Sequence, residues 1–433
     1  MDWKEIYKSR LVSAQDAVKH IKSGDRVVFG HSVAEPTALV EAMVENKAAY
    51  ENVEIVHMVA MGKGDYAQPG MEKHFRHNAF FVGGSTRQPV SEGRADYTPC
   101  FFYKVPSMFK EGYLPVDVLM TQVSPPDEHG YCTLGTSVDY TKAALDCAKI
   151  VIVQVNDQMP RTMGDSFVHV SDIDFFVEES RVLVELKPPV ITDVEKAIGE
   201  NCAKLVEDGS TLQLGIGAIP DAVLLFLKDK KDLGIHSEMF SDGVVELVES
   251  GVITNKMKSI HKGKMIVTFL MGTKRLYDFI NGNPTVEMYP VDYVNNPAVI
   301  MQNYKMVSIN SCVQVDLMGQ VASETIGYKQ FSGVGGQVDF VRGASMATGG
   351  KSIIAMMSTA SNNKISRIVP LLDEGAAVTT SRNDVHYIVT EYGIADLRGK
   401  TLKDRGRALI GIAHPIFREQ LIAVWEDRFK TKF

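Results

Sequence analysis

Short apolar runs separated by stretches of helical periodicity set the pattern of this chain. The runs at Lys149–Val153 and Lys351–Ala355 are nearly continuous after their opening lysine. Strands that are covered on both faces have this appearance. Alternation of such strands with helical stretches predicts an α/β fold with open, mainly parallel sheets.

The two halves of the chain resemble each other at three successive places. Residues 17–39 and 202–224 both read as helix, Gly turn, strand, Gly loop, then a helix with Pro in its first turn. Val118–Gly130 matches Val307–Gly319, each with D-x-x-G nine residues after the first valine, and Lys149–Val153 matches Lys351–Ala355. We infer a duplication, with one α/β domain in each half.

The predicted junction between these domains lies near Lys187-Pro188-Pro189, because consecutive prolines end regular structure and the second copy begins soon afterwards. The expected domains are therefore residues 1–190 and 191–433. A single large sheet with chance similarity is the alternative, which the ordered recurrence of three motifs disfavours.

Composition and charge exclude several classes of function. The 433 residues are 45% hydrophobic and 23% charged, as in a globular protein with two or three domain cores. A formal charge of −7 with scattered Lys and Arg disfavours a nucleic-acid partner. The charged N-terminus and the lack of an apolar window of about 18 residues disfavour a signal peptide and a membrane span, so we expect a cytoplasmic protein.

The five cysteines are odd in number, far apart and without C-x-x-C spacing. This spacing favours neither a disulfide framework nor a zinc site. We expect the following residues to be buried and to behave as small apolar side chains: Cys100, Cys132, Cys147, Cys202 and Cys312.

A Gly-rich loop, Gly215–Ile219, follows an apolar strand and opens a helix. Backbone N–H groups and the helix dipole at such a loop suit an anionic or carbonyl group, although the glycines also fit a simple tight turn. The equivalent loop of the first half has one glycine, Gly30, followed by His31–Pro36. The loop of the first domain therefore has side chains at positions where the loop of the second domain exposes only its backbone. We expect the loop of the first domain to line an acyl pocket.

Glu238 follows the Gly-rich loop by about one helix, on a segment predicted to be the next strand of the same βαβ unit. Ligands of open α/β sheets lie outside the carboxyl ends of the strands, so this carboxylate is expected to face the crevice at Gly215–Ile219. Its neighbours Met239 and Phe240 indicate a partly apolar setting. Burial of a carboxylate in such a setting costs free energy, so a carboxylate without a function is not expected there. A surface glutamate in a turn is the alternative.

A second Gly-rich loop contains Gly335 and Gly336. Successive N–H groups of such a loop can line one concave side and hold a developing oxyanion. Glu324 and Glu391 are rival carboxylates, but neither stands one βαβ unit after a Gly loop, so we expect supporting or structural roles for them.

The histidines give no sign of a metal site. No pair has helical metal-site spacing in a suitable context, so no metal is expected, at His129 or elsewhere. His57 follows a predicted strand, Val53–Val56, and is a candidate for substrate contact. The chain has no G-x-S-x-G and no P-loop, which disfavours the usual hydrolase and kinase mechanisms.

Together these residues resemble the acetyl-CoA hydrolase/transferase family, the class I CoA-transferases, over essentially the whole chain. The segments that carry the resemblance are Leu214–Val223, His236–Gly243, Ser308–Glu324, Ser332–Ala344 and Val389–Gly406. The resemblance implies two tandem open α/β domains, similar to those of sugar-phosphate isomerases, with the active site between them, and a homodimer.

The resemblance also implies roles for individual residues. Glu238 matches the glutamate that becomes a glutamyl-CoA thioester, Gly335 and Gly336 match the loop that stabilises the oxyanion, and Asn295 matches a residue near the reacting centre. The implied CoA-binding residues are Gly215, Ile216, Gly217, Ala218, Ile219, Cys312 and Ser361. His31 and His57 are the candidates for the substrate pocket.

Within the family, the members that act on 4-hydroxybutyrate are the most similar. They imply exchange of CoA between 4-hydroxybutyryl-CoA or butyryl-CoA and acetate, by a ping-pong mechanism through Glu238. CoA is then a co-substrate and covalent intermediate, the partners are acyl-CoA and short-chain carboxylates, and no cofactor is permanently bound. The alternatives are an acyl-CoA hydrolase, if the site admits water, and a non-catalytic CoA-binding module, which would function without Glu238.

Overall fold

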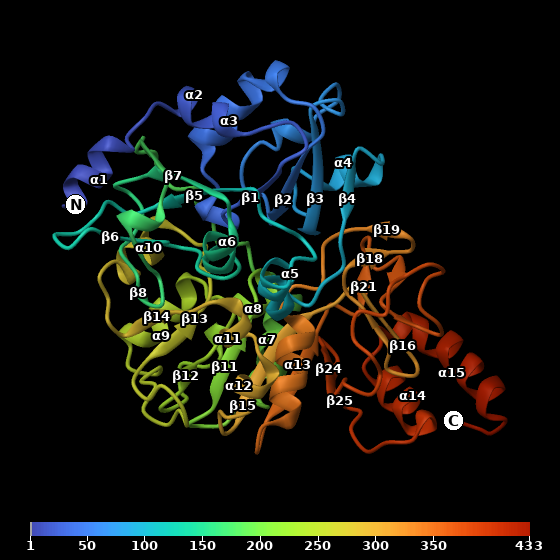
Figure 1. Cartoon of the computed structure of the whole chain (residues 1–433). Coiled ribbons are helices and arrows are strands. Elements are labelled where there is room, and N and C mark those ends of the chain that lie inside the picture. The colour runs from blue at the N-terminus through green and yellow to red at the C-terminus, as the bar shows by residue number, and fades with distance from the viewer. Residues whose placement is uncertain (1) are drawn as a thin grey trace. The chain divides into compact units, whose positions relative to one another are not determined.

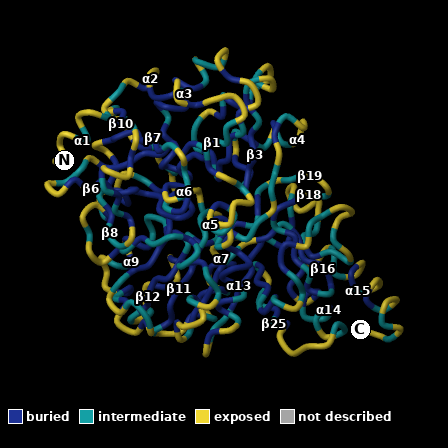
Figure 2. The backbone as a smooth tube through the Cα atoms, viewed as in Figure 1, coloured by how far each residue is buried: buried dark blue, intermediate teal, exposed yellow. Residues whose placement is uncertain are grey.

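The computed structural model describes residues 2–433, and contacts between residues divide the chain into two compact units. Unit 1 comprises the residues up to Leu186 together with Ile266–Val294, and unit 2 comprises Lys187–Met265 and Asn295–Phe433. Each unit has its own apolar core. The strands of both units are mostly buried, whereas the exposed positions gather in loops and on outer helix faces (Figure 2).

Unit 1 is built on a parallel sheet of seven strands in the order β10-β7-β5-β1-β2-β3-β4 (Figure 1). The apolar run at Lys149–Val153, which predicted a strand covered on both faces, forms β7, whose residues after Ile150 are all buried. The strands are β1 (Arg26–Phe29), β2 (Val53–Met58), β3 (Phe75–Phe81), β4 (Ala95–Tyr97), β5 (Val118–Val123), β7 (Ile150–Val155) and β10 (Phe175–Glu178).

The helices of unit 1 are short. They are α1 (Trp3–Ser9), α2 (Ala14–Ala17), α3 (Thr37–Glu45), α4 (Arg87–Ser91), α5 (Val105–Lys110), α6 (Thr141–Cys147), α10 (Lys274–Ile280) and α11 (Val291–Val294). Short strands complete the unit: β6 (Tyr131–Thr133) pairs with β9 (Phe167–His169), and β8 (Met163–Gly164) pairs with β14 (Val286–Met288), which neighbours β13 (Met265–Val267).

Unit 2 contains a sheet of six strands in the order β12-β11-β15-β20-β24-β25, parallel except for the last pair. The strands are β11 (Thr211–Leu214), β12 (Gly234–Ile235), β15 (Met306–Ser311), β20 (Lys351–Ala355), β24 (Tyr387–Thr390) and β25 (Gly393–Asp396). The helices are α7 (Asp193–Ala203), α8 (Ala218–Leu225), α9 (Asp242–Glu249), α12 (Pro297–Ile300), α13 (Gln337–Met346), α14 (Leu402–Gly411) and α15 (Pro415–Phe429).

Small sheets lie beside the main sheet of unit 2. They are formed by β16 (Gln314–Asp316), β17 (Val321–Ala322) and β23 (Ile368–Val369), by β18 (Thr325–Ile326) and β19 (Lys329–Gln330), and by β21 (Thr359–Ala360) and β22 (Ile365–Ser366). Among residues 2–433, no helix combines the length and the apolar character that crossing a bilayer requires.

The duplication predicted from the sequence is present in the topology. The order β10-β7-β5-β1-β2 of unit 1 recurs as β24-β20-β15-β11-β12 in unit 2. The registers agree as well, because Val27 faces Val118 and the matched Leu212 faces Val307. The third match is one residue out: Val118 faces Ile150 and Val307 faces Lys351, so Ile150 rather than Lys149 is the counterpart of Lys351.

The D-x-x-G motifs form the same turn in both copies. An Asp127 oxygen accepts from the N–H groups two and four residues later, each at 2.9 Å, and an Asp316 oxygen does the same at 2.9 Å. The closing glycines, Gly130 and Gly319, have φ of 85° and 89°, which glycine adopts without strain. The matched motif therefore has a structural role.

One segment differs from a single division of the chain near residue 190. Ile266–Val294 falls in the second predicted domain but belongs to unit 1. The N–H groups of Val138 and Asp139 donate to the carbonyl of Thr268, and Leu186 donates to Gly272. These hydrogen bonds and the β8–β14 pairing attach the segment to unit 1. No local pattern of apolar residues in the sequence predicts this attachment.

Candidate active site

The Gly-rich loop of unit 2 connects β11 to α8 at the carboxyl end of the strand. Gly217 precedes the helix with φ of 112°, and Pro220 lies in the first turn of α8. All five residues of Gly215–Ile219 are partly exposed, although the strand before them is buried. The loop therefore presents accessible backbone at a helix N-terminus, where N–H groups lack partners within the helix.

Glu238 lies beside this loop. The parallel pairing of β12 with β11 ends after Ile235, and the chain then turns so that Met239 forms an antiparallel bridge with Leu214, the residue before Gly215. The Ser237 hydroxyl donates to the Met239 carbonyl at 2.5 Å and accepts from the Leu214 N–H at 3.3 Å. Glu238 thus stands in an irregular turn, three residues beyond the strand on which the sequence predicted it.

The residues that follow Glu238 in the chain are apolar and buried. Met239 is 3% exposed and Phe240 is fully buried, whereas Glu238 itself is partly exposed. Its carboxylate therefore reaches the surface of the unit from a rigid, buried segment. A group that must react with a bound ligand requires this combination of fixed position and access.

Asn295 and Gly336 converge on the Glu238 carboxylate within unit 2. The Asn295 amide nitrogen donates to Glu238 Oε2 at 2.7 Å. Gly336 presents its Cα to the same atoms, because a Cβ there would lie 1.9 Å from Glu238 Oε2 and 2.3 Å from Asn295 Nδ2. Only glycine leaves room for the carboxylate at this point.

Gly335 and Gly336 also open α13, which packs on β15 and β20. Gly335 has φ of 54°, and Gly336 is the residue before the first turn of the helix. Three elements therefore bring a carboxylate, an amide N–H and a helix N-terminus to one place. This arrangement can hold an anion or stabilise an oxyanion formed next to Glu238.

Two family models together match most of the chain. The model of the acetyl-CoA hydrolase/transferase N-terminal domain matches residues 1–188, and that of the C-terminal domain matches residues 272–424. The chain belongs to the acetyl-CoA hydrolase/transferase family. The family resemblance derived from the sequence is thereby confirmed, as is the α/β fold with parallel sheets.

Relatives of this acetyl-CoA hydrolase/transferase family member align with it along nearly the whole chain. A 4-hydroxybutyrate coenzyme A transferase of Clostridium kluyveri is 68% identical over 99% of this chain and 100% of its own. The crystal structure of a 4-hydroxybutyrate CoA-transferase from Porphyromonas gingivalis is 44% identical, with a TM-score of 0.86, over 99% and 100% of the two chains. RipA from Yersinia pestis is 36% identical over the full length of both chains, with a TM-score of 0.95.

Both rival carboxylates of this family member have other partners. Glu391 accepts from the Ser358 N–H at 2.9 Å and the Ser358 hydroxyl at 2.5 Å. Glu324 accepts from the Thr379 hydroxyl at 3.1 Å and from the Gln330 amide at 3.3 Å. These bonds anchor neighbouring turns, in line with the structural roles expected for them.

Two predicted CoA-binding residues lie outside the Glu238 cluster. The Cys312 side chain packs in the apolar core with its sulfur 3.4 Å from Met356 Sδ, and burial raises the pKa of its thiol to about 12. Ser361 is exposed in the turn between β21 and β22. Of the other cysteines, Cys132 and Cys202 are buried, whereas Cys100 and Cys147 are partly exposed.

The two histidines predicted for the substrate pocket belong to unit 1 and are both buried. His31 Nδ1 lies 3.0 Å from Asp139 Oδ2, so this ring nitrogen donates to the carboxylate. His57 lies at the end of β2 rather than after it, 3.3 Å from the Tyr66 hydroxyl, and burial holds its pKa well below the usual value. Contact of either residue with substrate stays a prediction.

Sequence reasoning missed Asp339. This residue is 1% exposed in the first turn of α13, and its Oδ2 lies 3.4 Å from the Asn295 amide nitrogen. The available signal was an acidic residue three positions after Gly336, directly behind the second Gly-rich loop. Within residues 2–433, no group of three or more His, Cys, Asp and Glu is placed to hold a metal ion.

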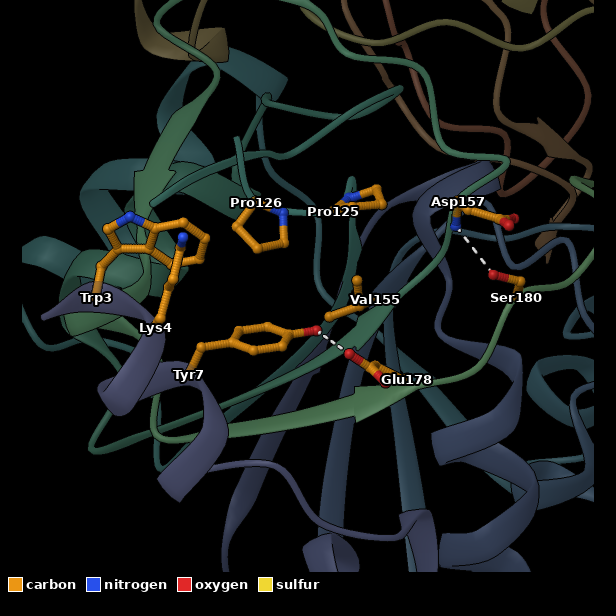
Figure 3. Close-up of a pocket in the computed structure, with 9 residues that line it drawn as sticks. All are labelled: Trp3, Lys4, Tyr7, Pro125, Pro126, Val155, Asp157, Glu178 and Ser180. Carbon is orange, nitrogen blue, oxygen red and sulfur yellow. Dashed lines mark hydrogen bonds between the residues drawn. The ribbon is translucent and has the colours of Figure 1, made fainter. Parts of the chain in front are cut away.

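A cavity of about 500 Å³ in unit 1 is separate from all predicted site residues (Figure 3). The Tyr7 hydroxyl donates to Glu178 at 2.7 Å across its floor. Its lining residues are Trp3, Lys4, Tyr7, Pro125, Pro126, Val155, Asp157, Glu178 and Ser180.

Proposed function

We propose that this protein transfers CoA between short-chain carboxylic acids and that Glu238 carries CoA as a thioester. The observation that supports this mechanism most directly is the geometry around Glu238. Its carboxylate has an amide donor at 2.7 Å, a glycine that leaves space beside it, and the accessible loop Gly215–Ile219 next to it in the fold. A nucleophilic carboxylate needs access and an oxyanion needs donors, and both are provided at one point.

The first half-reaction requires no proton transfer. A Glu238 oxygen attacks the thioester carbonyl of the acyl-CoA, the C–S bond breaks, and CoA leaves as a thiolate while an acyl-glutamyl anhydride forms. The thiolate then attacks the glutamyl carbonyl carbon, the anhydride C–O bond breaks, and the first acid leaves as a carboxylate. Glu238 is now the CoA thioester, and a second carboxylate reverses both steps.

Asn295 and the N-terminus of α13 stabilise the tetrahedral oxyanions in this scheme. The Asn295 N–H points at the reacting carboxyl group, and the N–H groups that follow Gly335 and Gly336 have no partner within the helix. Donors that are fixed before the reaction cost no reorganisation when charge develops. The loop Gly215–Ile219 is proposed to contact CoA, with Cys312 and Ser361 as further CoA contacts and His31 and His57 in the acyl pocket.

The acid that this enzyme uses is proposed to be 4-hydroxybutyrate, with acetate as the exchange partner. The support is the similarity to the Clostridium kluyveri and Porphyromonas gingivalis proteins, whose names carry that acid. A homodimer, which the family resemblance implies, and a cytoplasmic location are proposed as well. Competition between 4-hydroxybutyrate, butyrate, propionate and acetate as acceptors ranks the acids.

Isotope exchange tests the proposed function. The enzyme is mixed with acetyl-CoA and labelled acetate, with no other acid present. A covalent carrier returns label to acetyl-CoA under these conditions, because the first half-reaction runs in both directions. Exchange without net release of free CoA supports transfer, whereas release of CoA without exchange identifies a hydrolase and contradicts the proposal.

A further inference from the structure

The amide group of Asn295 lies between two carboxylates of unit 2. Its nitrogen is 2.7 Å from Glu238 Oε2 and 3.4 Å from Asp339 Oδ2. Asn295 is fully buried and Asp339 is 1% exposed, so water does not compete freely for these groups. The NH₂ side of the amide thus faces both acids, which is the orientation that two hydrogen-bond acceptors require.

The two acceptors differ in what the reaction does to them. Glu238 is an anion only at the start of the proposed cycle, and it becomes an uncharged anhydride and then a thioester. A neutral carbonyl accepts a weaker hydrogen bond than a carboxylate does. Asp339 takes part in no bond making or breaking, so it is the acceptor that stays the same while Glu238 changes.

We propose that Asp339 is a positioning residue, which keeps the Asn295 N–H directed at residue 238 throughout the catalytic cycle. This inference rests on the proposed role of Glu238 as the CoA carrier. The reverse orientation of the amide would turn the Asn295 carbonyl oxygen toward Asp339 and toward the developing oxyanion. Both contacts are repulsive, so the correct orientation is fixed before charge develops on the substrate.

A purely structural role for Asp339 predicts a different pattern. An acidic residue in the first turn stabilises a helix through the helix dipole. In that case, replacement of Asp339 lowers the stability of α13 and reduces activity whether or not Asn295 is present. The two roles therefore separate in a double-mutant cycle.

The cycle consists of wild type, Asp339→Asn, Asn295→Ala and the double variant. The substituted amide matches the shape of the Asp339 carboxylate but can accept or donate equally well, so it no longer selects one orientation of Asn295. We expect kcat of Asp339→Asn to fall about 10-fold, less than the roughly 100- to 1,000-fold expected for loss of the Asn295 donor itself. KM for the acyl-CoA should stay within about twofold, because an interaction made only in the transition state changes kcat.

In the Asn295→Ala background, Asp339→Asn should have no further effect on kcat, since the group through which it acts is gone. Asp316→Asn is the matched control, because Asp316 is a fully buried acid of the same unit that holds the D-x-x-G turn. It should lower the melting temperature and leave kcat unchanged. Asp339→Ser takes the place of Asp339→Asn in the same cycle if the latter does not fold.

A second readout separates this inference from the proposed function. Each variant is incubated with acyl-CoA, treated with hydroxylamine, and analysed for the hydroxamate at residue 238. Wild type should be labelled, and Asp339→Asn should be labelled more slowly by the same factor as its kcat. An equal loss in both Asn295 backgrounds, or an unchanged kcat in Asp339→Asn, overturns the positioning role, whereas absence of label in active wild type overturns the proposed function.

Discussion

The loop after β1 in unit 1 and the loop after β11 in unit 2 occupy equivalent places in the duplicated sheets, yet the residues of the first loop are buried and those of the second are partly exposed. In unit 1, β1 lies between β2, the next strand in sequence, and β5. In unit 2, β11 likewise lies between β12 and β15. Such switch points are where open α/β sheets bind ligands. Residues 31–36 are all buried, whereas Gly215–Ile219 are all partly exposed.

Side chains close the first loop. His31 pairs with Asp139, the Ser32 hydroxyl contacts Met271 Sδ at 3.2 Å, and Glu35 accepts from the N–H groups of Met61 and Gly62 at 3.0 and 2.7 Å. The second loop has no comparable set of inward polar side chains, and its glycines leave the backbone accessible. One copy of the fold thus lines this place with buried side chains, beside a cavity of about 360 Å³ whose lining includes Glu35, Met61 and Gly62, whereas the other leaves its backbone accessible.

The largest expected effect tests whether the reaction takes place in unit 2, whose loop is accessible. Glu238→Gln keeps the size and shape of the side chain but replaces the nucleophilic carboxylate with an amide. We expect the rate of CoA transfer to fall by at least about 1,000-fold, because covalent carriage ends. Steady-state assays with acyl-CoA and acetate measure the effect, and Glu249→Gln on α9, an exposed glutamate of the same unit, should leave it unchanged. Comparable activity of Glu238→Gln and wild type would assign the chemistry elsewhere.

Gly336→Ala tests the space beside the carboxylate. The added Cβ would lie 1.9 Å from Glu238 Oε2 and must displace it or the Asn295 amide. We expect kcat to fall about 100-fold, as when an oxyanion donor is lost, with the fold retained. Gly411→Ala is the control, because a Cβ there meets nothing within 4 Å. Equal activities of the two variants would show that Gly336 does not limit the site.

A matched pair of substitutions contrasts the two loops in stability. Glu35→Ala removes the acceptor of two partly buried N–H groups, which should lower the free energy of unfolding by about 2 kcal/mol. Ile216→Ala in the open loop should leave the free energy of unfolding nearly unchanged and raise KM for the acyl-CoA. Chemical denaturation and steady-state kinetics measure the two effects. Similar losses of stability in both variants would contradict the distinction between the buried loop of unit 1 and the accessible loop of unit 2.

The smallest effect concerns the pH dependence of stability. Burial raises the pKa of Glu35 above the ordinary value of 4.5, although the N–H groups of Gly62 and Met61 oppose the shift. The folded state therefore holds this proton more tightly than the unfolded state, so the contribution of Glu35 to stability falls as pH rises from 4.5 through its folded pKa. Glu35→Gln should remove that decline in melting temperature; an unchanged slope relative to wild type would contradict the assignment.

Much of the fold could be predicted from the sequence because it depends on local patterns of residues. The apolar runs at Ile150 and Ile353 mark central strands, and the repeated helix, turn and loop motifs predict the repeated strand order. The return of Ile266–Val294 to unit 1 was not accessible, since it depends on pairing with β8 and on bonds to Thr268 that leave no periodic signal.

The candidate active site, too, could be predicted only in part from the sequence. Spacing alone predicted Glu238 beside the Gly-rich loop, and the bridge between Leu214 and Met239 is the contact that brings them together. The approach of Asn295 and Asp339 to Glu238 depends on how α13 and the segment before α12 pack, which one sequence does not reveal. Cys312 was predicted both as a buried apolar residue and as a CoA contact, and its side chain occupies the core.

Chemical trapping at residue 238 tests the central claim most directly. The protein is incubated with acyl-CoA alone, treated with hydroxylamine or borohydride, digested, and the peptide containing residue 238 is analysed by mass spectrometry. The account predicts a hydroxamate or a reduced alcohol at Glu238, which forms only when acyl-CoA is present. An unmodified Glu238 in protein that transfers CoA, or a label on Glu391 instead, would contradict it.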